Sequence, residues 1–529
     1  MSSAFLCSKC GTTLSSGREA LDFAVPPDRS LHRLAVSDVS PGSSEMTFDY
    51  SIVTKIDELL AGFDNEIAPL RNRLRQLEEH RAVLLNYRAR TRAPLSPLRR
   101  MPPEVLGEIF SWTMSPVLDR LRRGRIDTSR SPWLLTQICS AWRRVAVSTP
   151  SLWSQVTIDY PESANNSSRY SLSLVEAQLE RSNKLTVYFY GSEELDPSSQ
   201  IQMFELLLQH ASRWEGLSLG ITSAIMPLLP TLRDRLSSLK HLWIQWDTAD
   251  SQGEAPSIDC FQTSTSLIDV GICNAYRDVP IPFPAEQLTR YELNAPWLTH
   301  LGILGAAPGL VEAHIGISFD DEPWPESGER IELLQLRRLY VSNSRILDRL
   351  SAPALEELAL ECWGSLTTHI DVFFDRSSCR PRRLALTGTL PARATTMILQ
   401  KFTSITEFTV EVDDSSSPDE LHNLITLLSA PTHGEASAVV APQLSRISFG
   451  CQHDTFVDYP LLLEMFNYRW RAPDCVFEHA ALLTDSGPVP NRTTVNGLDA
   501  LRREGLNLVV VEGVEARDEM HSWSFSTSW

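Results

Sequence analysis

The chain has 529 residues, 42% of them hydrophobic, which is enough to build a large folded core. Its formal net charge of −18 argues against nucleic acid as the main partner, because binding to phosphates needs a basic surface. The nine cysteines are odd in number and scattered, which favours a reducing compartment without a disulfide framework.

Residues 1–50 are predicted to be mostly disordered, because Ser, Pro and Asp dominate after Ala24 and no hydrophobic period emerges. The one feature is the pair Cys7 and Cys10, which supplies half of a zinc-ribbon ligand set. A structural zinc site needs four ligands, and His32 is the only further candidate nearby. Zinc binding and a pair without metal both remain open, so we assign no metal site and no cofactor.

Apolar residues with alternating spacings of four and three predict a helix over residues 51–90. Gly62 and Pro69 lie within it, and Arg81 interrupts its apolar stripe. Two arrangements remain open: a dimeric coiled coil, and a helix folded back onto the segment that follows. The stripe consists of Ile56, Leu60, Phe63, Ile67, Leu70, Leu74, Leu77 and Leu84.

Two short helices are predicted within residues 91–160. Pro102 and Pro103 begin the first, where a missing backbone N–H is tolerated. Ser131 and Pro132 begin the second, and Pro150 ends it. The apolar residues of the two helices are Val105, Leu106, Ile109 and Phe110, and then Trp133, Leu134, Leu135, Ile138, Cys139, Trp142 and Val145.

These residues carry a family resemblance. Met-Pro-Pro-Glu-Val-Leu-Gly-Glu-Ile-Phe at 101–110, then Trp-Leu-Leu-Thr-Gln-Ile-Cys-Ser-Ala-Trp-Arg-Arg-Val-Ala at 133–146 and Thr-Pro-Ser-Leu-Trp at 149–153, resembles the F-box. The variant is the one common in F-box proteins of mushroom-forming (basidiomycete) fungi. The chain departs from the family twice: Met101 replaces the usual Leu, and the segment from Ser115 to Arg130 is a long insertion.

The resemblance implies that residues 91–160 bind the SKP adaptor of an SCF-type ubiquitin ligase, and through it a cullin. The rest of the chain then binds a target protein, and no enzyme activity is expected of the chain itself. The alternative is a protein-interaction scaffold, with the same modules, that assembles no ligase. We expect Val105, Leu106 and Val145 to be core residues. The residues that the resemblance places against the adaptor are Met101, Pro102, Pro103, Ile109, Phe110, Leu135, Ile138, Cys139 and Trp142.

A six-residue figure, Leu-x-x-Leu-x-Leu with apolar substitutes, recurs through the second half of the chain. Most of its intervals are about 19 to 28 residues, the period of a leucine-rich repeat. We find it at Leu239/Leu242/Ile244, Leu267/Val270/Ile272, Leu288/Tyr291/Leu293, Leu310/Ala313/Ile315, Leu336/Leu339/Val341, Leu355/Leu358/Leu360, Ile405/Phe408/Val410 and Leu444/Ile447/Phe449, with a degenerate copy at Pro381/Leu384/Leu386.

The repeats predict an irregular leucine-rich-repeat solenoid with a parallel sheet over residues 161–515, followed by a tail at 516–529. The predicted fold class is therefore mixed α/β: an N-terminal helix, a small all-α F-box module and the solenoid. No phosphate-binding loop, nucleophile elbow or zinc-binding helix motif occurs, which agrees with a protein that is not an enzyme.

The sequence also bears on the location of the protein and on the charge of its partners. The chain has no apolar leader sequence and no run of about eighteen apolar residues, so we expect a cytoplasmic or nuclear protein without a membrane partner. From Arg71 to Arg144 it has sixteen arginines and six acidic residues. An acidic partner for this segment and arginines that only solvate helix faces both remain open.

Overall fold

A computed structural model describes residues 5–6, 13–14, 43–92, 101–121, 125–160, 170–253, 257–320, 324, 330–362, 366–388, 391–412, 417–429, 439–452, 457–485 and 490–523. The chain divides into two compact units, Met1–Met101 and Pro102–Trp529, which are described separately. Cys7, Cys10 and His32 lie outside the described residues, so the zinc hypothesis stays untested.

The first unit is dominated by one helix. The strands β1 (Phe5–Leu6) and β2 (Thr13–Leu14) form a short antiparallel pair, and α2 (Ser43–Arg92) is a continuous helix of 50 residues. α2 runs through Pro69 and includes residues 43–50, which the sequence had predicted to be mostly disordered. Every side chain described between Tyr50 and Thr91 is exposed to solvent.

The second unit begins with short helices. α3 (Pro103–Ser111), α5 (Leu135–Ile138) and α6 (Ser140–Val147) precede the 3₁₀ helix η3 (Pro150–Trp153). Cys139 caps α6, because its sulfur accepts a hydrogen bond from the backbone N–H of Trp142 at 3.5 Å. The inserted segment contributes a further short helix, α4 (Val117–Leu121). We refer to residues 102–153 as the helical module.

A parallel sheet of 14 strands follows, in which the strands lie in chain order. A chain that returns to the same edge after every strand must cross back each time, so each strand and its connection form one unit of a stack. The strands are β3 (Gln155–Asp159), β4 (Leu185–Tyr190), β5 (Trp214–Ile221), β6 (His241–Trp246), β7 (Asp269–Cys273), β8 (Arg290–Ala295), β9 (Glu312–Ile317), β11 (Arg338–Val341), β13 (Glu357–Cys362), β14 (Arg383–Gly388), β15 (Glu407–Val412), β16 (Arg446–Cys451), β17 (His479–Thr484) and β18 (Asn507–Glu512).

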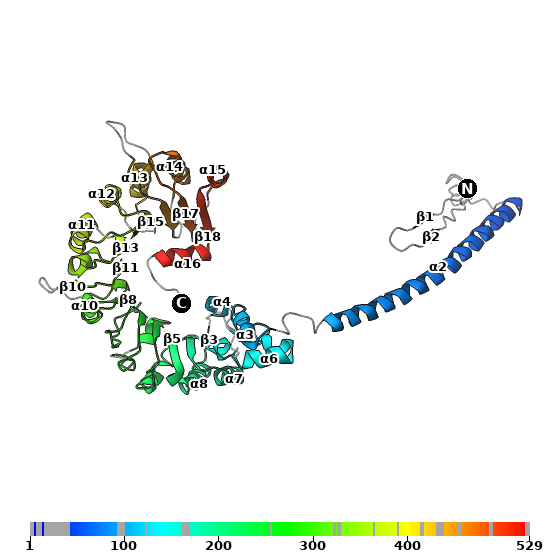
Figure 1. Cartoon of the computed structure of the whole chain (residues 1–529), viewed down its shortest axis with the longest axis horizontal. Helices are drawn as coiled ribbons and strands as arrows, with labels where there is room; N and C mark the ends of the chain where they lie inside the picture. Colours follow the sequence, from blue (N-terminus) through cyan, green and yellow to red (C-terminus); the bar gives the residue numbers. More distant parts are fainter. Residues whose placement is uncertain are drawn as a thin grey trace. The chain divides into compact units, whose positions relative to one another are not determined.

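Within this unit the sheet is curved, with the strands on its inner side and most of the connecting helices on its outer side (Figure 1). The longer connections contain α7 (Leu172–Arg181), α8 (Pro197–Leu208), α10 (Trp297–Ala306), α11 (Leu366–Ser377), α12 (Ala392–Lys401), α13 (Pro418–Ser429), α14 (Tyr459–Arg471) and α15 (Arg492–Glu504). Shorter ones contain α9 (Ala249–Gln252), η4 (Ala211–Arg213), η5 (Met226–Leu232) and η6 (Ser344–Arg349), and the strands β10 (Ile331–Glu332) and β12 (Leu350–Ser351) form a separate parallel pair.

The core lies between the sheet and the outer helices. Successive residues of a strand point to opposite faces, so the two late apolar positions of each six-residue figure share the outer face. Leu384 and Leu386 of β14 are fully buried there, in one continuous cluster with helix residues such as Leu399 and Leu424. The fold is therefore mixed α/β with a long parallel sheet, as the sequence predicted.

The C-terminal helix α16 (Val514–Trp523) lies on the inner side of the curved sheet (Figure 1). Met520 and Trp523 are buried and form a small cluster with Leu483 of β17. A Cβ atom added to Gly450 of β16 would come within 2.6 Å of the Trp523 ring, so this glycine makes room for the helix. Residues 516–523, predicted as part of a tail, are thus a packed helix.

Candidate functional site

The helical module has a small core of its own. Phe110 of α3 is 1% exposed, and its ring centroid lies 4.9 Å from that of Trp142 of α6. Leu106, Leu135 and Val145 are also buried. Of the residues that the resemblance places against an adaptor, Phe110 and Leu135 are therefore inside the module.

Other apolar residues of the module face solvent. Ile138 is 51% exposed, and Pro102, Pro103 and Cys139 are exposed as well. Ile109, Trp142 and, in the first unit, Met101 are half-buried. Val105, predicted as a core residue, is 46% exposed, because it faces away from Phe110 on the short helix α3. The module also exposes Trp112 (79%) and Leu134 (40%), which the sequence analysis did not assign to a surface.

Two tryptophans of the module join it to the sheet. Trp153 is fully buried and donates its indole N–H to the carbonyl of Ala146 at 2.8 Å. The rings of Trp133 and Trp153 meet edge to face at 4.9 Å, and the guanidinium of Arg181 in α7 lies 4.6 Å from the centroid of Trp153. A cation on an aromatic ring is attractive, so the module is fixed to the first helix of the stack.

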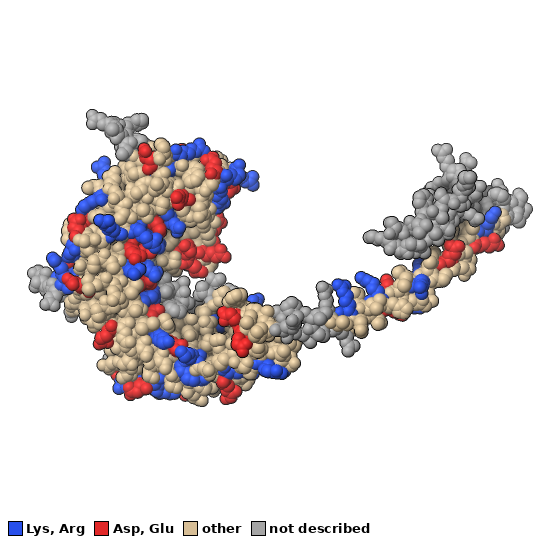
Figure 2. Space-filling model, in the orientation of Figure 1, with Lys and Arg blue, Asp and Glu red and all other residues tan. Residues whose placement is uncertain are grey.

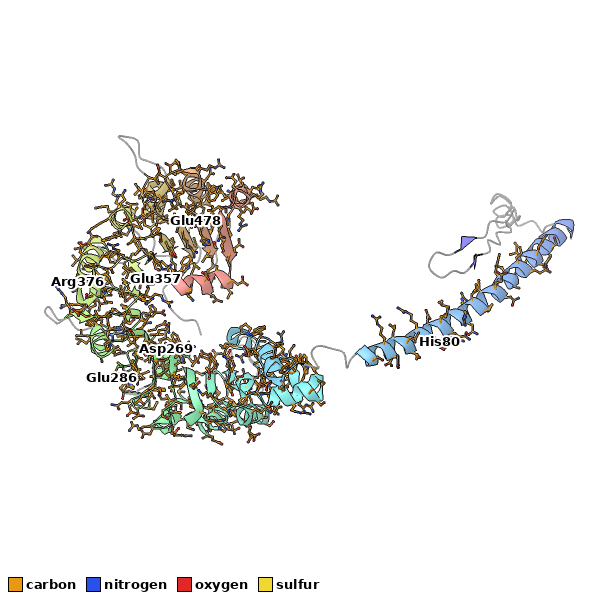
Figure 3. All side chains as sticks on the ribbon, viewed as in Figure 1. His80, Asp269, Glu286, Glu357, Arg376 and Glu478 are labelled. Carbon is orange, nitrogen blue, oxygen red and sulfur yellow. The ribbon has the colours of Figure 1, made fainter. Side chains whose placement is uncertain are left out.

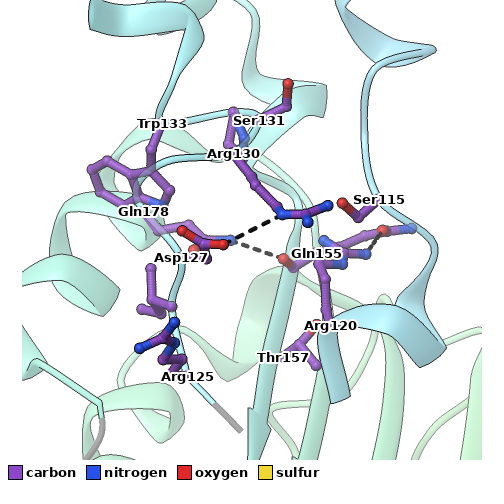
Figure 4. A pocket seen from close by; sticks show the side chains of 12 residues that line it. Ser115, Arg120, Arg125, Asp127, Arg130, Ser131, Trp133, Gln155, Thr157 and Gln178 are labelled. Atoms are coloured by element: carbon purple, nitrogen blue, oxygen red, sulfur yellow. Dashed lines mark hydrogen bonds and ion pairs between the residues drawn. The ribbon is translucent and has the colours of Figure 1, made fainter. Parts of the chain in front are cut away.

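The inserted segment packs against the edge strand of the sheet. α4 contacts β3, and Arg120 donates a hydrogen bond to the side-chain carbonyl of Gln155 (Figure 4). Asp127 accepts hydrogen bonds from Ser129, and these lower the pKa of its carboxyl group. The Arg130 Nε atom lies 3.4 Å from Asp127. Arg120, Asp127 and Arg130 line a pocket of about 50 Å³ with Gln155. The hydrogen bond between Arg120 and Gln155 ties the insertion to β3.

The inner face of the sheet has a row of alternating charges. The row consists of the residues that come just before the second apolar position of each Leu-x-x-Leu-x-Leu pattern. These residues lie side by side on neighbouring strands, as the strand register shows. Asp269 and Glu357 mark this row in Figure 3. We call it the charge row; its members are His241, Asp269, Arg290, Glu312, Arg338, Glu357, Arg383, Glu407 and Arg446, together with His479, which is the register partner of Arg446 on β17.

Neighbours in the charge row form ion pairs across the strands. Arg290 lies 3.1 Å from Asp269 and 2.7 Å from Glu312, and Arg338 lies 3.0 Å from Glu312. Burial opposes the charge of Arg290, but Asp269, Glu292 and Glu312 outweigh it and raise the pKa of this guanidinium. The row therefore favours the observed register between neighbouring strands. Sliding one strand by one residue along its neighbour would separate these opposite charges.

Aromatic rings lie along the same inner face near the helical module. A Cβ on Gly220 would come within 2.8 Å of the Tyr190 ring, and one on Gly271 would overlap the ring of Trp243, so each ring covers a neighbouring glycine. Burial raises the pKa of Tyr190 to about 12, and that of Asp159, its register partner on β3, to about 6. This end of the inner face presents flat rings with polar groups beside them.

Two histidines, His300 on α10 and His314 on β9, have lowered pKa values. His300 lies 2.7 Å from the Tyr291 hydroxyl and 3.0 Å from the Gly316 carbonyl oxygen, and burial lowers its pKa to about 4. Burial, together with the charge of Arg290, lowers the pKa of His314 to about 3. Within the described parts of the chain, no group of three or more His, Cys, Asp or Glu side chains is arranged to hold a metal ion.

Two surfaces therefore stand out: the exposed apolar residues of the helical module and the inner face of the sheet. On the face of the second unit drawn in Figure 2, acidic and basic side chains are interspersed. The charge row was not predicted from the sequence, although the residue before the second apolar position is His, Asp, Arg, Glu, Arg, Glu, Arg, Glu and Arg in the nine six-residue repeats. Among the described residues, no helix is long and apolar enough to cross a membrane.

Comparison of the chain with protein-family models gives no match, and comparison with curated proteins gives no significant match.

Proposed function

We propose that the chain is an F-box protein, the substrate-recognition subunit of an SCF-type ubiquitin ligase. The helical module docks an SKP adaptor and through it a cullin, and a leucine-rich-repeat-like sheet binds a target protein. The observation that supports this most directly is the module itself: a compact helical unit that carries the F-box-like sequence, exposes apolar side chains and is fixed to one end of a long sheet.

The exposed residues define the proposed adaptor interface more narrowly than the sequence did. Pro102, Pro103, Ile138 and Cys139 are available to a partner, and burying apolar surface is the main driving force of association. Phe110 and Leu135 act indirectly, because they hold α3 against α5 and α6 from inside the module. Their loss would damage the fold and the interface together.

The link between module and sheet suits a protein that works by positioning. A ligase subunit of this kind needs no catalytic residue, because it raises the rate by holding the target close to the transferring enzyme. Trp153 and Arg181 restrict movement between the adaptor-binding module and the sheet. A bound target would then keep a defined distance from the adaptor.

The inner face of the sheet is the proposed target surface. Tyr190, Trp243 and the charge row lie on it, whereas helices cover the outer face. Aromatic and charged side chains are frequent anchors of protein interfaces. α16 covers the same face at β16 to β18, so the uncovered part lies nearer the helical module.

The test is capture of an SKP adaptor by the full chain. We expect a stoichiometric complex, and we expect Ile138→Asp to weaken it by about tenfold or more, since a charge would enter an apolar interface. The matched control is Val372→Asp on α11, which introduces the same charge at a side chain of similar exposure, 49% against 51%. It should bind like the unmodified chain.

Tryptophan fluorescence checks folding, because all thirteen tryptophans follow residue 101. If the folded chain captures no adaptor, the ligase function is wrong and a scaffold without ligase activity is favoured. If Ile138→Asp binds normally, the proposed interface is wrong even though the partner is right.

A further inference from the structure

The apolar stripe of α2 is uncovered. In heptad notation, the a positions are Val53, Leu60, Ile67, Leu74 and Arg81, and the d positions are Ile56, Phe63, Leu70, Leu77 and Leu84. The apolar members are all exposed, from 37% for Ile56 to 68% for Leu70. Gly62 and Pro69 both fall at position c, away from the stripe, and the helix continues through both. An exposed stripe of this length and spacing is typical of a helix that pairs in a coiled coil.

The charges of α2 are separated along its length. Residues 43–70 carry six acidic side chains and one lysine, a net charge of −5, whereas residues 71–92 carry seven arginines and two acidic side chains, a net charge of +5. Figure 2 shows the basic side chains gathered toward the C-terminal end of the helix. A helix of this kind is complementary to itself when reversed.

We propose that α2 binds α2 of a second copy of this chain as an antiparallel coiled coil. The register that buries the stripe most fully pairs Ile67 with the partner's Leu70. It also pairs Phe63 with the partner's Leu74 and Leu60 with the partner's Leu77. The overlap covers residues 53–84, about 48 Å of helix at about 1.5 Å per residue.

Arg81 decides between the two orientations. In the antiparallel pair, Arg81 lies beside the partner's Ile56. In a parallel pair in register, Arg81 would meet the partner's Arg81 at an a position of the stripe, where like charges repel. The antiparallel pair thus also keeps the two basic halves apart.

The residues that flank the stripe form opposite-charge pairs in either orientation, so Arg81 and the charge separation along the helix carry the choice between them. Position g of one helix faces position g of the other in an antiparallel pair, so Glu66 faces the partner's Arg73. At the e positions, Asp64 faces the partner's Arg71. One like-charge contact, Asp57 with the partner's Glu78, remains in this register. A parallel pair instead sets Glu66 against the partner's Arg71 and Arg73 against the partner's Glu78.

Dimerisation is tested first by the mass of the full-length protein in sedimentation across a range of concentrations. We expect a dimer that dissociates on dilution. Leu70→Asp should raise the dissociation constant on the order of a hundredfold or more, because it places a charge in the centre of the apolar stripe. Val83→Asp is the control: Val83 is 67% exposed on the same helix but lies at position c.

A charge exchange then tests the orientation. Glu66→Arg and Arg73→Glu should each weaken the dimer on the order of tenfold, since each creates two symmetry-related like-charge contacts. The double variant should restore the original affinity in the antiparallel pair. In a parallel pair it would be weaker than either single variant, because Arg71 and Glu78 would both face like charges.

Each other outcome would overturn the proposal. A chain that stays monomeric at high concentration, with Leu70→Asp unchanged in mass, means that α2 has no second copy as its partner. A monomer whose helix content falls with Leu70→Asp means that α2 folds back within its own chain. A dimer that the double variant weakens further is parallel. The midpoint of tryptophan fluorescence in urea confirms that residues after 101 stay folded in every variant.

Discussion

α2 and the curved sheet differ in how their regularly spaced apolar side chains are covered. Both carry apolar residues at regular spacing, about 3.5 residues in α2 and about one six-residue figure per strand in the sheet. In the sheet, Leu384 and residues like it are fully buried by helices of the same chain. In α2, Leu70 and Leu74 remain 68% and 57% exposed. A regular apolar pattern therefore specifies a surface to be covered, but not which chain covers it.

The charges of the two regions differ in the same way. In the sheet, opposite charges alternate from strand to strand, so Arg290 finds its carboxylates on the neighbouring strands. In α2, opposite charges are collected in opposite halves of one helix, too far apart to neutralise each other. The alternating charges of the sheet can pair with each other within one chain. The separated charges of α2 can pair only with another molecule, such as a second α2 helix that runs in the opposite direction.

The largest expected difference in the free energy of unfolding comes from replacing a leucine by alanine in each region. Leu384→Ala removes a fully buried side chain from β14 and should lower the free energy of unfolding by about 2–5 kcal/mol. Leu74→Ala removes a 57% exposed side chain from α2. It should leave the urea transition followed by tryptophan fluorescence unchanged, because all thirteen tryptophans follow residue 101.

Leu74→Ala should instead weaken the dimer measured by sedimentation. If it lowers the fluorescence midpoint as much as Leu384→Ala does, α2 is part of the same cooperative core and the contrast between the two regions is wrong.

The second prediction concerns charges. Arg290→Met should lower the free energy of unfolding by about 3 kcal/mol, because Asp269, Glu292 and Glu312 would lose the cation they share in a site where the arginine is only 14% exposed. Arg337→Met is the control, since that arginine is 62% exposed and pairs with Glu356 at 3.2 Å.

Arg337→Met should cost less than about 1 kcal/mol. Equal losses in the two variants, measured by urea denaturation, would mean that the charge row contributes no more than an ordinary surface ion pair.

The sequence predicted the strands well, because each figure combines two buried positions with a fixed spacing. All nine figures contain a strand, including the degenerate copy with Leu384. β17 was missed because the positions that face the core on the outer side of the sheet are Ala480 and Leu482, and alanine is a weak apolar signal. α16 was missed because charged residues separate Ala516 from Met520, so the sequence shows no clear apolar face there. Its apolar side chains are buried because Gly450 on β16 leaves room for Met520 and Trp523.

The candidate site was predicted less completely. The apolar pattern of α3 and α6 located the helical module, but periodicity alone could not tell Phe110, which is inside, from Ile138, which is outside. That distinction depends on how helices of four to nine residues pack against one another, because the rotation of each helix about its axis decides which side chains face the core. The burial of Trp153 under Arg181 depends on two segments separated in sequence, so no local pattern contains it.

The last prediction concerns pH, and it separates two kinds of carboxylate within the sheet. Asp269 lies beside a guanidinium, whereas burial raises the pKa of Asp159 from 3.8 to about 6. Between about pH 4 and pH 6 the folded protein keeps a proton that the unfolded chain releases, so the free energy of unfolding falls as the pH rises through this window.

Asp159→Asn should remove this loss. The variant's stability relative to the unmodified chain should therefore rise from pH 4 to pH 6 and then stay constant, as measured by urea denaturation at several pH values. A difference that is the same at pH 4.5 and pH 7 would show that Asp159 carries its charge without a penalty. The inner face beside Tyr190 would then be a well-solvated surface, although burial raises the pKa of Tyr190.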